Sequence, residues 1–222
     1  MRHCGLWPNG ASAFCNNINV LEATELECER GGKRLFRGLS FRLPRGELLR
    51  VAGPNGSGKT SLLRILCGLL TPTQGEVRWR GTRIGALAEE FSRQLVYIGH
   101  ASAVKDDLTP YENLDIACRL LGLQAHREAL AWALSAFAVP DLPVRKLSQG
   151  QRRRAALARL LLSESIPLWL LDEPFVALDA GAASYAEELI GRHLQAGGMV
   201  VYTTHQPAAI DPRARVLDLA AR

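Results

Sequence analysis

The sequence predicts an α/β protein with a mainly parallel central sheet, and three observations lead to that class. Segments with strand-like and helix-like periodicity alternate along most of the 222 residues. Two continuous apolar runs, IPLWLLDEP and GGMVVYTTH, are typical of strands buried on both faces of a sheet. Amphipathic helices at residues 105–140 interrupt the strand-rich pattern. A chain of this length is expected to form one domain, with or without a small subdomain.

Composition alone selects no function. Apolar residues make up 47% and charged residues 22%, and 27 basic against 22 acidic residues give a net charge of +5. The five cysteines are odd in number and scattered, so we interpret them as free thiols in a reducing compartment. The sequence contains no apolar run long enough for a membrane helix. Residues 1–20 lack both periodicity and a continuous apolar stretch, so we expect a disordered extension rather than a secretory signal.

The first half of the chain is expected to begin with paired strands. VLEATELECE and LFRGLSFRLPRGELLRVAG have strand patterns, and RGGK and PRGE break them. A loop at residues 53–58 precedes a helix from Lys59, KTSLLRILCGLL, with Leu62, Leu63, Leu66 and Leu70 on one face. TPTQGEVRWRG then predicts a turn and a short strand, and RQLVYIGH predicts another strand.

The second half begins with helices. LTPYENLDIACRLLGL has a capping residue at Thr109 and a proline at the first helical position. HREALAWALSAFAV is expected to be a second helix that Pro140 stops, and LSQGQRRRAALARLLLSE a third. IPLWLLDEP is then a buried strand, AASYAEELIGRHLQA a helix, GGMVVYTTH a buried strand and ARVLDLA a short final strand.

The stretch GPNGSGKTSL matches the pattern G-x-x-x-x-G-K-[ST] at Gly53, Gly58, Lys59 and Thr60. Glycines let backbone N–H groups turn inward around an anion, and the following helix directs the positive end of its dipole to the same point. Lys59 would reach the β- and γ-phosphates of a nucleotide, and the Thr60 hydroxyl would bind Mg²⁺. The alternative is a glycine-rich surface turn. The strand before the loop and the helix after it favour the phosphate loop.

Two acidic residues follow the apolar strand LWLL. Asp172 and Glu173 therefore lie at the carboxyl end of a strand, where ligands bind in open α/β sheets. Asp172 would hold Mg²⁺, directly or through water, and Glu173 would polarise the attacking water as general base. The alternative is an acidic pair that serves only solubility. The phosphate-loop pattern earlier in the chain favours the catalytic interpretation.

LSQGQRRRAALAR resembles the signature of ABC-transporter ATPases, usually written LSGGQ. FVALD resembles the family's D-loop, which contains Asp179, and TTH resembles its switch loop, which contains His205. The resemblance covers about residues 21–218. It implies a P-loop NTPase fold of the ABC ATPase type over residues 21–222, with an N-terminal antiparallel β subdomain. The helical insert, at about residues 105–160, matches the position of the family's helical subdomain.

The resemblance also implies a mechanism. Two copies would pack head to tail around two ATP molecules, each bound between one copy's phosphate loop and the other's signature. With ATP and Mg²⁺ as cofactors, Glu173 and His205 would be catalytic, and Thr60 and Asp172 would hold the metal. The expected ATP-binding residues are Gly53, Pro54, Asn55, Gly56, Ser57, Gly58, Lys59, Thr60, Ser61, His100, Ser148, Gln149, Gly150 and Asp179.

The sequence departs from the family pattern at several positions. Gln149 replaces the third residue of the signature, usually glycine, which puts close backbone approach there in doubt. His100 stands where the family has glutamine, and it would either hydrogen-bond a bound water or have a weaker role or none. Arg30 lies near the position of an aromatic residue that stacks on adenine, and its guanidinium could stack instead. We interpret RRR at residues 152–154 as a solvated helix face rather than a nucleic-acid patch.

Several phrases resemble the ATP-binding subunits of cytochrome c maturation (haem exporter) systems. They are LECER, LFRGLSF, YIGHA, LTPYENL, LWLLDEPFVALD and GGMVVYTTHQP. This resemblance implies a peripheral protein on the cytoplasmic face of the bacterial inner membrane, in complex with integral membrane permease subunits. We expect neither nucleic-acid binding nor direct haem binding. The alternative is the ATP-binding subunit of an unrelated ABC exporter or importer of a lipid, a drug or another small molecule.

Overall fold

A computed structural model describes residues 20–100, 104–204 and 214–220. Most of the expected extension at residues 1–20 lies outside these ranges, although Val20 begins the first strand. The expectation for His205 also falls outside the described residues. The division of the chain at about residue 20, and the extent of the helical subdomain, stay predictions.

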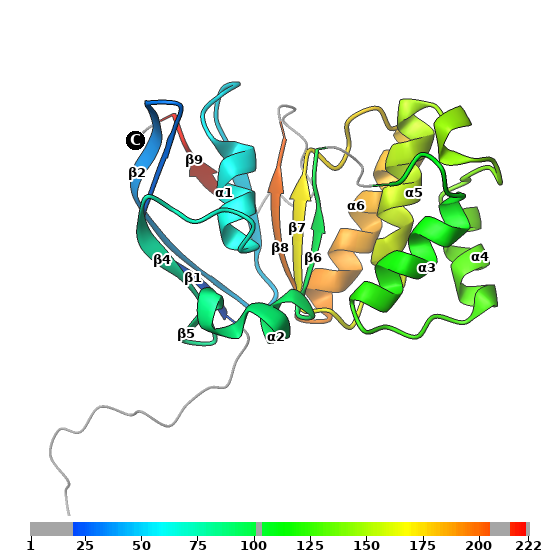
Figure 1. The fold of residues 1–222 in the computed structure, drawn as a ribbon, viewed down its shortest axis with the longest axis horizontal. Coiled ribbons are helices and arrows are strands. Elements are labelled where there is room, and N and C mark those ends of the chain that lie inside the picture. The colour runs from blue at the N-terminus through cyan, green and yellow to red at the C-terminus, as the bar shows by residue number, and fades with distance from the viewer. Residues whose placement is uncertain (1–19, 101–103, 205–213, 221–222) are drawn as a thin grey trace, which may run out of the picture.

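Two sheets organise the molecule (Figure 1). The antiparallel sheet has the order β2-β1-β4-β5, formed by Lys33–Pro44, Val20–Arg30, Gln74–Trp79 and Thr82–Arg83. The central sheet has the order β6-β7-β8-β3-β9 and is parallel throughout, formed by Leu95–Ile98, Leu168–Asp172, Met199–Thr203, Leu48–Ala52 and Arg215–Asp218. The predicted α/β class, with a parallel central sheet and an antiparallel N-terminal sheet, is confirmed.

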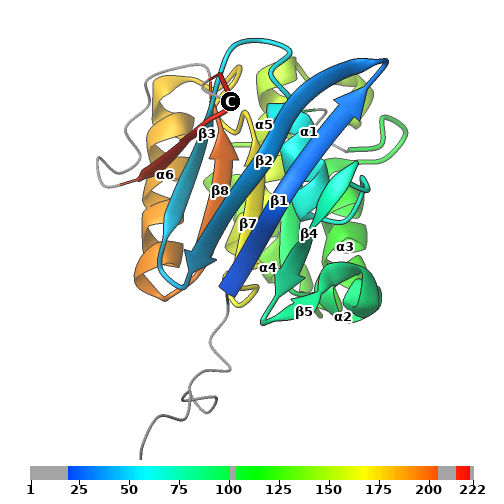
Figure 2. The same cartoon turned by 90° about the vertical axis from the view of Figure 1, so that its left-hand side faces the viewer.

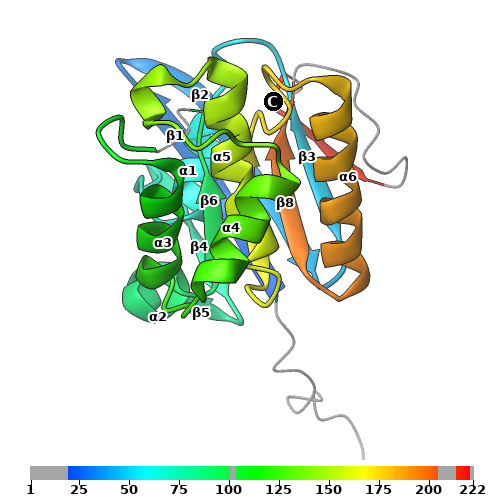
Figure 3. The ribbon, with the colours of Figure 1, turned by 90° about the vertical axis from the view of Figure 1, so that its right-hand side faces the viewer.

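Helices cover both faces of the central sheet. Helix α1 (Lys59–Leu66) packs between the two sheets, while α5 (Gln149–Leu161) and α6 (Ala180–Gln195) cover the opposite face (Figures 1 and 2). Helices α3 (Pro110–Leu120) and α4 (Arg127–Ala136) pack on α5, at the end of the molecule away from the antiparallel sheet (Figures 1 and 3). The 3-10 helix η1 (Ile84–Leu87), helix α2 (Ala88–Ser92) and the 3-10 helix η2 (Val144–Lys146) complete the described elements.

The strand β7 divides its side chains between two hydrophobic cores, as a strand buried on both faces should. Leu168 and Leu170 belong to the core that the antiparallel sheet and α1 enclose. Trp169 and Leu171 belong to the core beneath α3, α4, α5 and α6. All four side chains are fully buried. This packing on both faces holds the end of β7 in place, and with it Asp172, the last residue of the strand, and Glu173, which follows.

Most of the predicted elements are present, but the first helix ends earlier than expected. Leu62, Leu63 and Leu66 are buried on α1 as predicted. Leu70 lies beyond the helix, so placing it on the helical face was wrong. The reason is Gly68, whose φ of 79° places it in the left-handed region and whose N–H donates to the Ile65 carbonyl. Such a glycine ends a helix at little steric cost.

Candidate functional site

The phosphate-loop residues connect β3 to α1 at the carboxyl end of the central sheet. Gly58, at φ 100°, directly precedes α1, and a Cβ there would lie 3.0 Å from Leu35 Cβ. Only glycine fits this backbone conformation and this close approach without strain. Lys59 is 7% exposed, and its Nζ donates to the carbonyl oxygens of Gly53 (2.8 Å) and Pro54 (3.0 Å). The ammonium group is thus held against the loop, beside the N-terminus of the helix.

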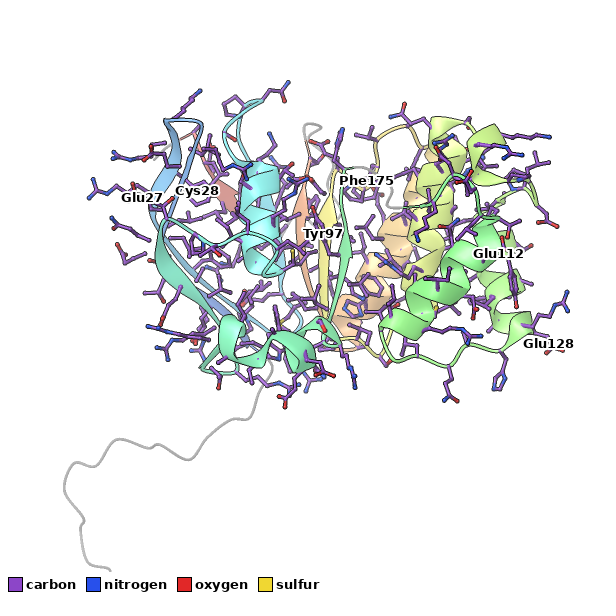
Figure 4. All side chains as sticks on the ribbon, viewed as in Figure 1. Glu27, Cys28, Tyr97, Glu112, Glu128 and Phe175 are labelled. Atoms are coloured by element: carbon purple, nitrogen blue, oxygen red, sulfur yellow. The ribbon has the colours of Figure 1, made fainter. Side chains whose placement is uncertain are left out.

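Thr60 and Asp172 meet across 112 residues of sequence. The Thr60 hydroxyl donates to Asp172 Oδ2 at 2.8 Å. Asp172 is 1% exposed and ends β7, and Glu173, which is 7% exposed, follows it. Because of this hydrogen bond, the two expected metal-binding oxygens, Thr60 Oγ1 and Asp172 Oδ2, are adjacent. Figure 4 shows Phe175, two residues after Glu173, near the upper end of the central sheet, while Tyr97 lies lower on β6.

A cleft of about 510 Å³ opens over this edge of the sheet. It brings together the phosphate loop, the general-base candidate and the cationic side chains of Arg30 and Arg64. Its lining residues are Arg30, Leu35, Asn55, Gly56, Gly58, Lys59, Thr60, Ser61, Arg64, His100 and Glu173. Cationic side chains and inward-facing N–H groups are the features that bind polyphosphates. The cleft is therefore suited to a nucleotide.

Arg30 and His100, two departures from the family pattern, lie in this cleft. His100 is exposed there, one residue after the buried Gly99 that follows β6. Phe36 is 1% exposed and packs in the core, so its ring cannot stack on a ligand. Arg30 and Leu35, but not Phe36, line this part of the cleft.

The signature residues lie elsewhere. Ser148 caps α5: its Oγ accepts from the Gln151 N–H (3.2 Å), and Gln151 Oε1 accepts from the Ser148 N–H (2.9 Å). Asp179 caps α6 in a similar way by accepting from the Ala182 N–H at 2.8 Å. The described lining of the cleft does not include Ser148, Gln149, Gly150 and Asp179, nor does it include Gly53, Pro54 and Ser57 of the phosphate loop itself. One copy of the chain therefore does not unite all of the predicted ATP-binding residues.

Gly150 explains how the signature helix approaches the D-loop so closely. A Cβ at position 150 would overlap the carbonyl oxygen of Ala177. Ala177 has φ 62°, and Leu178, the next residue, directly precedes Asp179. Gly150 therefore permits the backbone contact that sets the N-terminus of α5 against the loop before α6.

The expectation that residues 152–154 form a solvated face is wrong for Arg153. This side chain is 4% exposed and donates to the carbonyl oxygens of Gly99, Asp172, Glu173 and Pro174. Burial lowers the pKa of its guanidinium, and the charges of the nearby carboxylates, first Asp172 and then Glu173, oppose that shift. A sequence signal existed: Arg153, Leu157 and Leu160 have the i, i+4, i+7 spacing of one helix face.

Arg152 and Arg154, in contrast, make ion pairs nearer the surface. Arg152 Nη1 lies 2.8 Å from Asp106 Oδ1, and Arg154 Nη1 lies 3.6 Å from Asp179 Oδ2.

Thr203 is a second residue that the sequence analysis missed. Its buried hydroxyl contacts both Asp172 and Glu173, and no pattern in the sequence singled it out.

Comparison with known protein families decides the classification. The family model described as ABC transporter matches residues 36–176, which span the phosphate loop, the signature and the Asp172–Glu173 pair.

The chain belongs to the ABC transporter family.

Curated members of the ABC transporter family resemble this chain over nearly its whole length. The cytochrome c biogenesis ATP-binding export protein CcmA of Aromatoleum aromaticum is 50% identical over 204 residues, which is 90% of this chain and 95% of that protein. The protein of the same name in Pseudomonas fluorescens is 49% identical over 189 residues, 84% of this chain and 89% of that protein.

Solved structures of ABC proteins share the fold. An ATP-binding subunit of an ABC transporter is 26% identical with a TM-score of 0.75, covering 84% of this chain and 79% of that chain. A bacterial ABC transporter cassette, solved as a dimer, is 24% identical with a TM-score of 0.78, covering 90% and 94%. The architecture described above is therefore that of the ABC ATPases.

Proposed function

We propose that this chain is the ATP-hydrolysing subunit of a cytochrome c biogenesis export complex. The observation that carries this proposal is the 50% identity to curated proteins named for that role, over 90% of this chain and 95% of the relative. The cleft supports the enzymatic part, since it combines a phosphate loop with an acidic residue in position to act on water.

The phosphate loop would bind the β- and γ-phosphates of ATP. Its backbone N–H groups and the N-terminus of α1 supply positive potential, and Lys59 adds a full charge beside them. Thr60 and Asp172 fit Mg²⁺, because a hydroxyl and a carboxylate oxygen 2.8 Å apart are hard oxygen ligands. When bound, Mg²⁺ neutralises charge that develops on the phosphates.

Glu173 would act on the attacking water. Glu173 lines the same cleft as Lys59 and Thr60. The carboxylate would accept the proton of the water as the water oxygen attacks phosphorus, and ADP would leave. Arg30 would stack on the adenine, and His100 would contact water near the γ-phosphate. The catalytic role expected of His205 stays a prediction from the sequence.

A second copy of the chain would complete each site. The N-terminal groups of α5 and the exposed Ser148 and Gln149 lie outside the cleft of their own chain. We propose that they contact the ATP held by the partner, together with Gly150 and Asp179. Head-to-tail pairing would place one positive helix end on each side of the γ-phosphate.

The partners proposed for this pair are integral membrane permease subunits. No helix within the described residues is long and apolar enough to cross a bilayer. The relatives named as cytochrome c biogenesis ATP-binding export proteins support a place at the cytoplasmic face of the bacterial inner membrane, as a peripheral subunit. The cargo would be handled by the permease, so this chain would bind neither haem nor nucleic acid.

Complementation tests the proposal. A bacterium that lacks its own ATP-binding subunit for cytochrome c biogenesis should regain c-type cytochromes when it expresses this chain, but not the Lys59→Ala variant. The membrane permease subunits of that system should copurify with both variants. ATP hydrolysis that depends on Mg²⁺, without restored cytochromes or copurification, would assign the chain to a different exporter or importer.

A further inference from the structure

Glu173 has a backbone conformation that its own residue type does not favour. Its φ is 54°, in the left-handed region that residues other than glycine seldom adopt. Such a conformation persists only where surrounding groups hold it in place. The residue is buried and directly follows β7, so the groups that hold it should be found on neighbouring elements.

Thr203 of β8 holds the amide side of Glu173. The two strands are in register, with Thr203 opposite Asp172, and the threonine side chain is fully buried. Its Oγ1 accepts a hydrogen bond from the Glu173 N–H at 2.8 Å and donates to Asp172 Oδ1 at 2.7 Å. Because Asp172 Oδ2 accepts from Thr60, both carboxylate oxygens are fixed by threonine hydroxyls.

Arg153 of α5 holds the carbonyl side. Its Nη2 donates to the Glu173 carbonyl oxygen at 2.7 Å and also to that of Asp172. Its Nη1 donates to the Gly99 carbonyl at 2.8 Å, which connects the same guanidinium to the end of β6. Side chains from two other elements therefore hold the backbone of Glu173 on both sides.

We propose that Thr203 and Arg153 are positioning residues that hold the backbone of Glu173 so that its carboxylate is aimed for attack on ATP. The inference rests on the proposed function, in which Glu173 is the general base. Neither residue lines the described cleft, so each would act through Glu173 rather than on the nucleotide. A small displacement of a catalytic group, on the order of 1 Å, is enough to lower a rate by about a hundredfold.

Thr203→Val tests the inference with the least change in shape. Valine fills the same space but neither accepts from Glu173 nor donates to Asp172. We expect kcat for ATP hydrolysis to fall by about 10- to 100-fold, the range typical of lost outer-shell contacts. Affinity for ATP in EDTA should stay at the parental value, because the phosphate loop is intact. Thr203→Ser is the matched control, since it keeps the hydroxyl and should keep most of the rate.

A double-mutant cycle separates positioning from a general loss of structure. In the Glu173→Gln background the base is already absent, so Thr203→Val should lower single-turnover hydrolysis little further. Arg153→Lys keeps the charge but loses the planar fork of donors, so it should lower kcat with ATP affinity unchanged. Thermal unfolding of every variant checks that the fold is retained.

Two results would overturn the inference: parental kcat in Thr203→Val, or an equal loss in the parental and Glu173→Gln backgrounds. Failure of the proposed function gives a different result. If Glu173→Gln itself hydrolysed ATP at the parental rate, the assignment of the base would be wrong. If Glu173→Gln were inactive and Thr203→Val fully active, only the positioning roles would be wrong.

Discussion

Acid should destabilise this protein through a histidine that the fold keeps uncharged. His193 of α6 is 3% exposed, and its ring stacks on Trp169 of β7 with centroids 3.7 Å apart and planes 2° from parallel. The close approach depends on Gly198, where a Cβ would overlap the imidazole. Burial lowers the pKa of His193 from 6.5 to about 4, and backbone groups of Glu164 and Pro167 oppose part of that shift.

The size of the effect follows from the two pKa values. The unfolded chain takes up a proton on this histidine below its ordinary pKa of 6.5, while the folded chain resists protonation until the pH approaches about 4. Stability from this group is therefore fully present above the ordinary pKa and decreases as the pH falls toward the folded value. The full loss is about 3 kcal/mol, and about 2 kcal/mol is lost between about pH 7.5 and pH 5.

Urea denaturation measures this loss. The free energy of unfolding is compared at the two pH values for the parent, for His193→Phe and for His126→Gln, which changes an exposed histidine. Phenylalanine keeps a stacked ring but takes up no proton, so its pH-dependent loss should be smaller than the parent's by about 2 kcal/mol. The His126 control should match the parent. Equal losses in all three proteins would refute the argument.

Three further predictions concern the site. Lys59→Ala should weaken ATP binding itself, measured by titration with a fluorescent nucleotide, and unchanged affinity would contradict the phosphate-loop assignment. Gly150→Ala should lower the free energy of unfolding by about 1–3 kcal/mol, because the new Cβ overlaps the Ala177 carbonyl. The control Gly191→Ala, in a helix with open space around position 191, should stabilise by about 0.5–1 kcal/mol. Ser148→Arg should block hydrolysis by the dimer but leave ATP binding by the monomer intact, and loss of monomer binding would place Ser148 in its own chain's cleft.

The sequence predicted the parts of the site that local patterns define. The loop before Lys59 and the acids after β7 are short motifs between recognisable elements. Because the carboxyl ends of parallel strands share one edge, their meeting at Thr60 and Asp172 could be expected. The parallel class of the central sheet followed from the alternation of strands and helices, whereas the antiparallel N-terminal sheet was implied by the family resemblance.

Residues whose importance depends on tertiary contacts were harder to predict. Three consecutive arginines suggested one solvated face, yet successive helical residues point about 100° apart, so the three cannot share one face. Arg153 is the one that points toward the sheet. Thr203 is one residue in an apolar strand, and its two hydrogen bonds exist only because β8 pairs in register with β7. The short elements β5, η1 and α2 have too few residues for a detectable period.

The central claim, that Glu173 activates water for ATP hydrolysis, is tested most directly by Glu173→Gln. Single-turnover hydrolysis of radiolabelled ATP is measured in the assembled complex, alongside ATP affinity. Hydrolysis should fall by about 10²–10⁴-fold, because glutamine cannot accept the proton, while affinity should persist because other groups hold the phosphates. A Glu173→Gln protein that hydrolyses ATP at the parental rate would contradict the account.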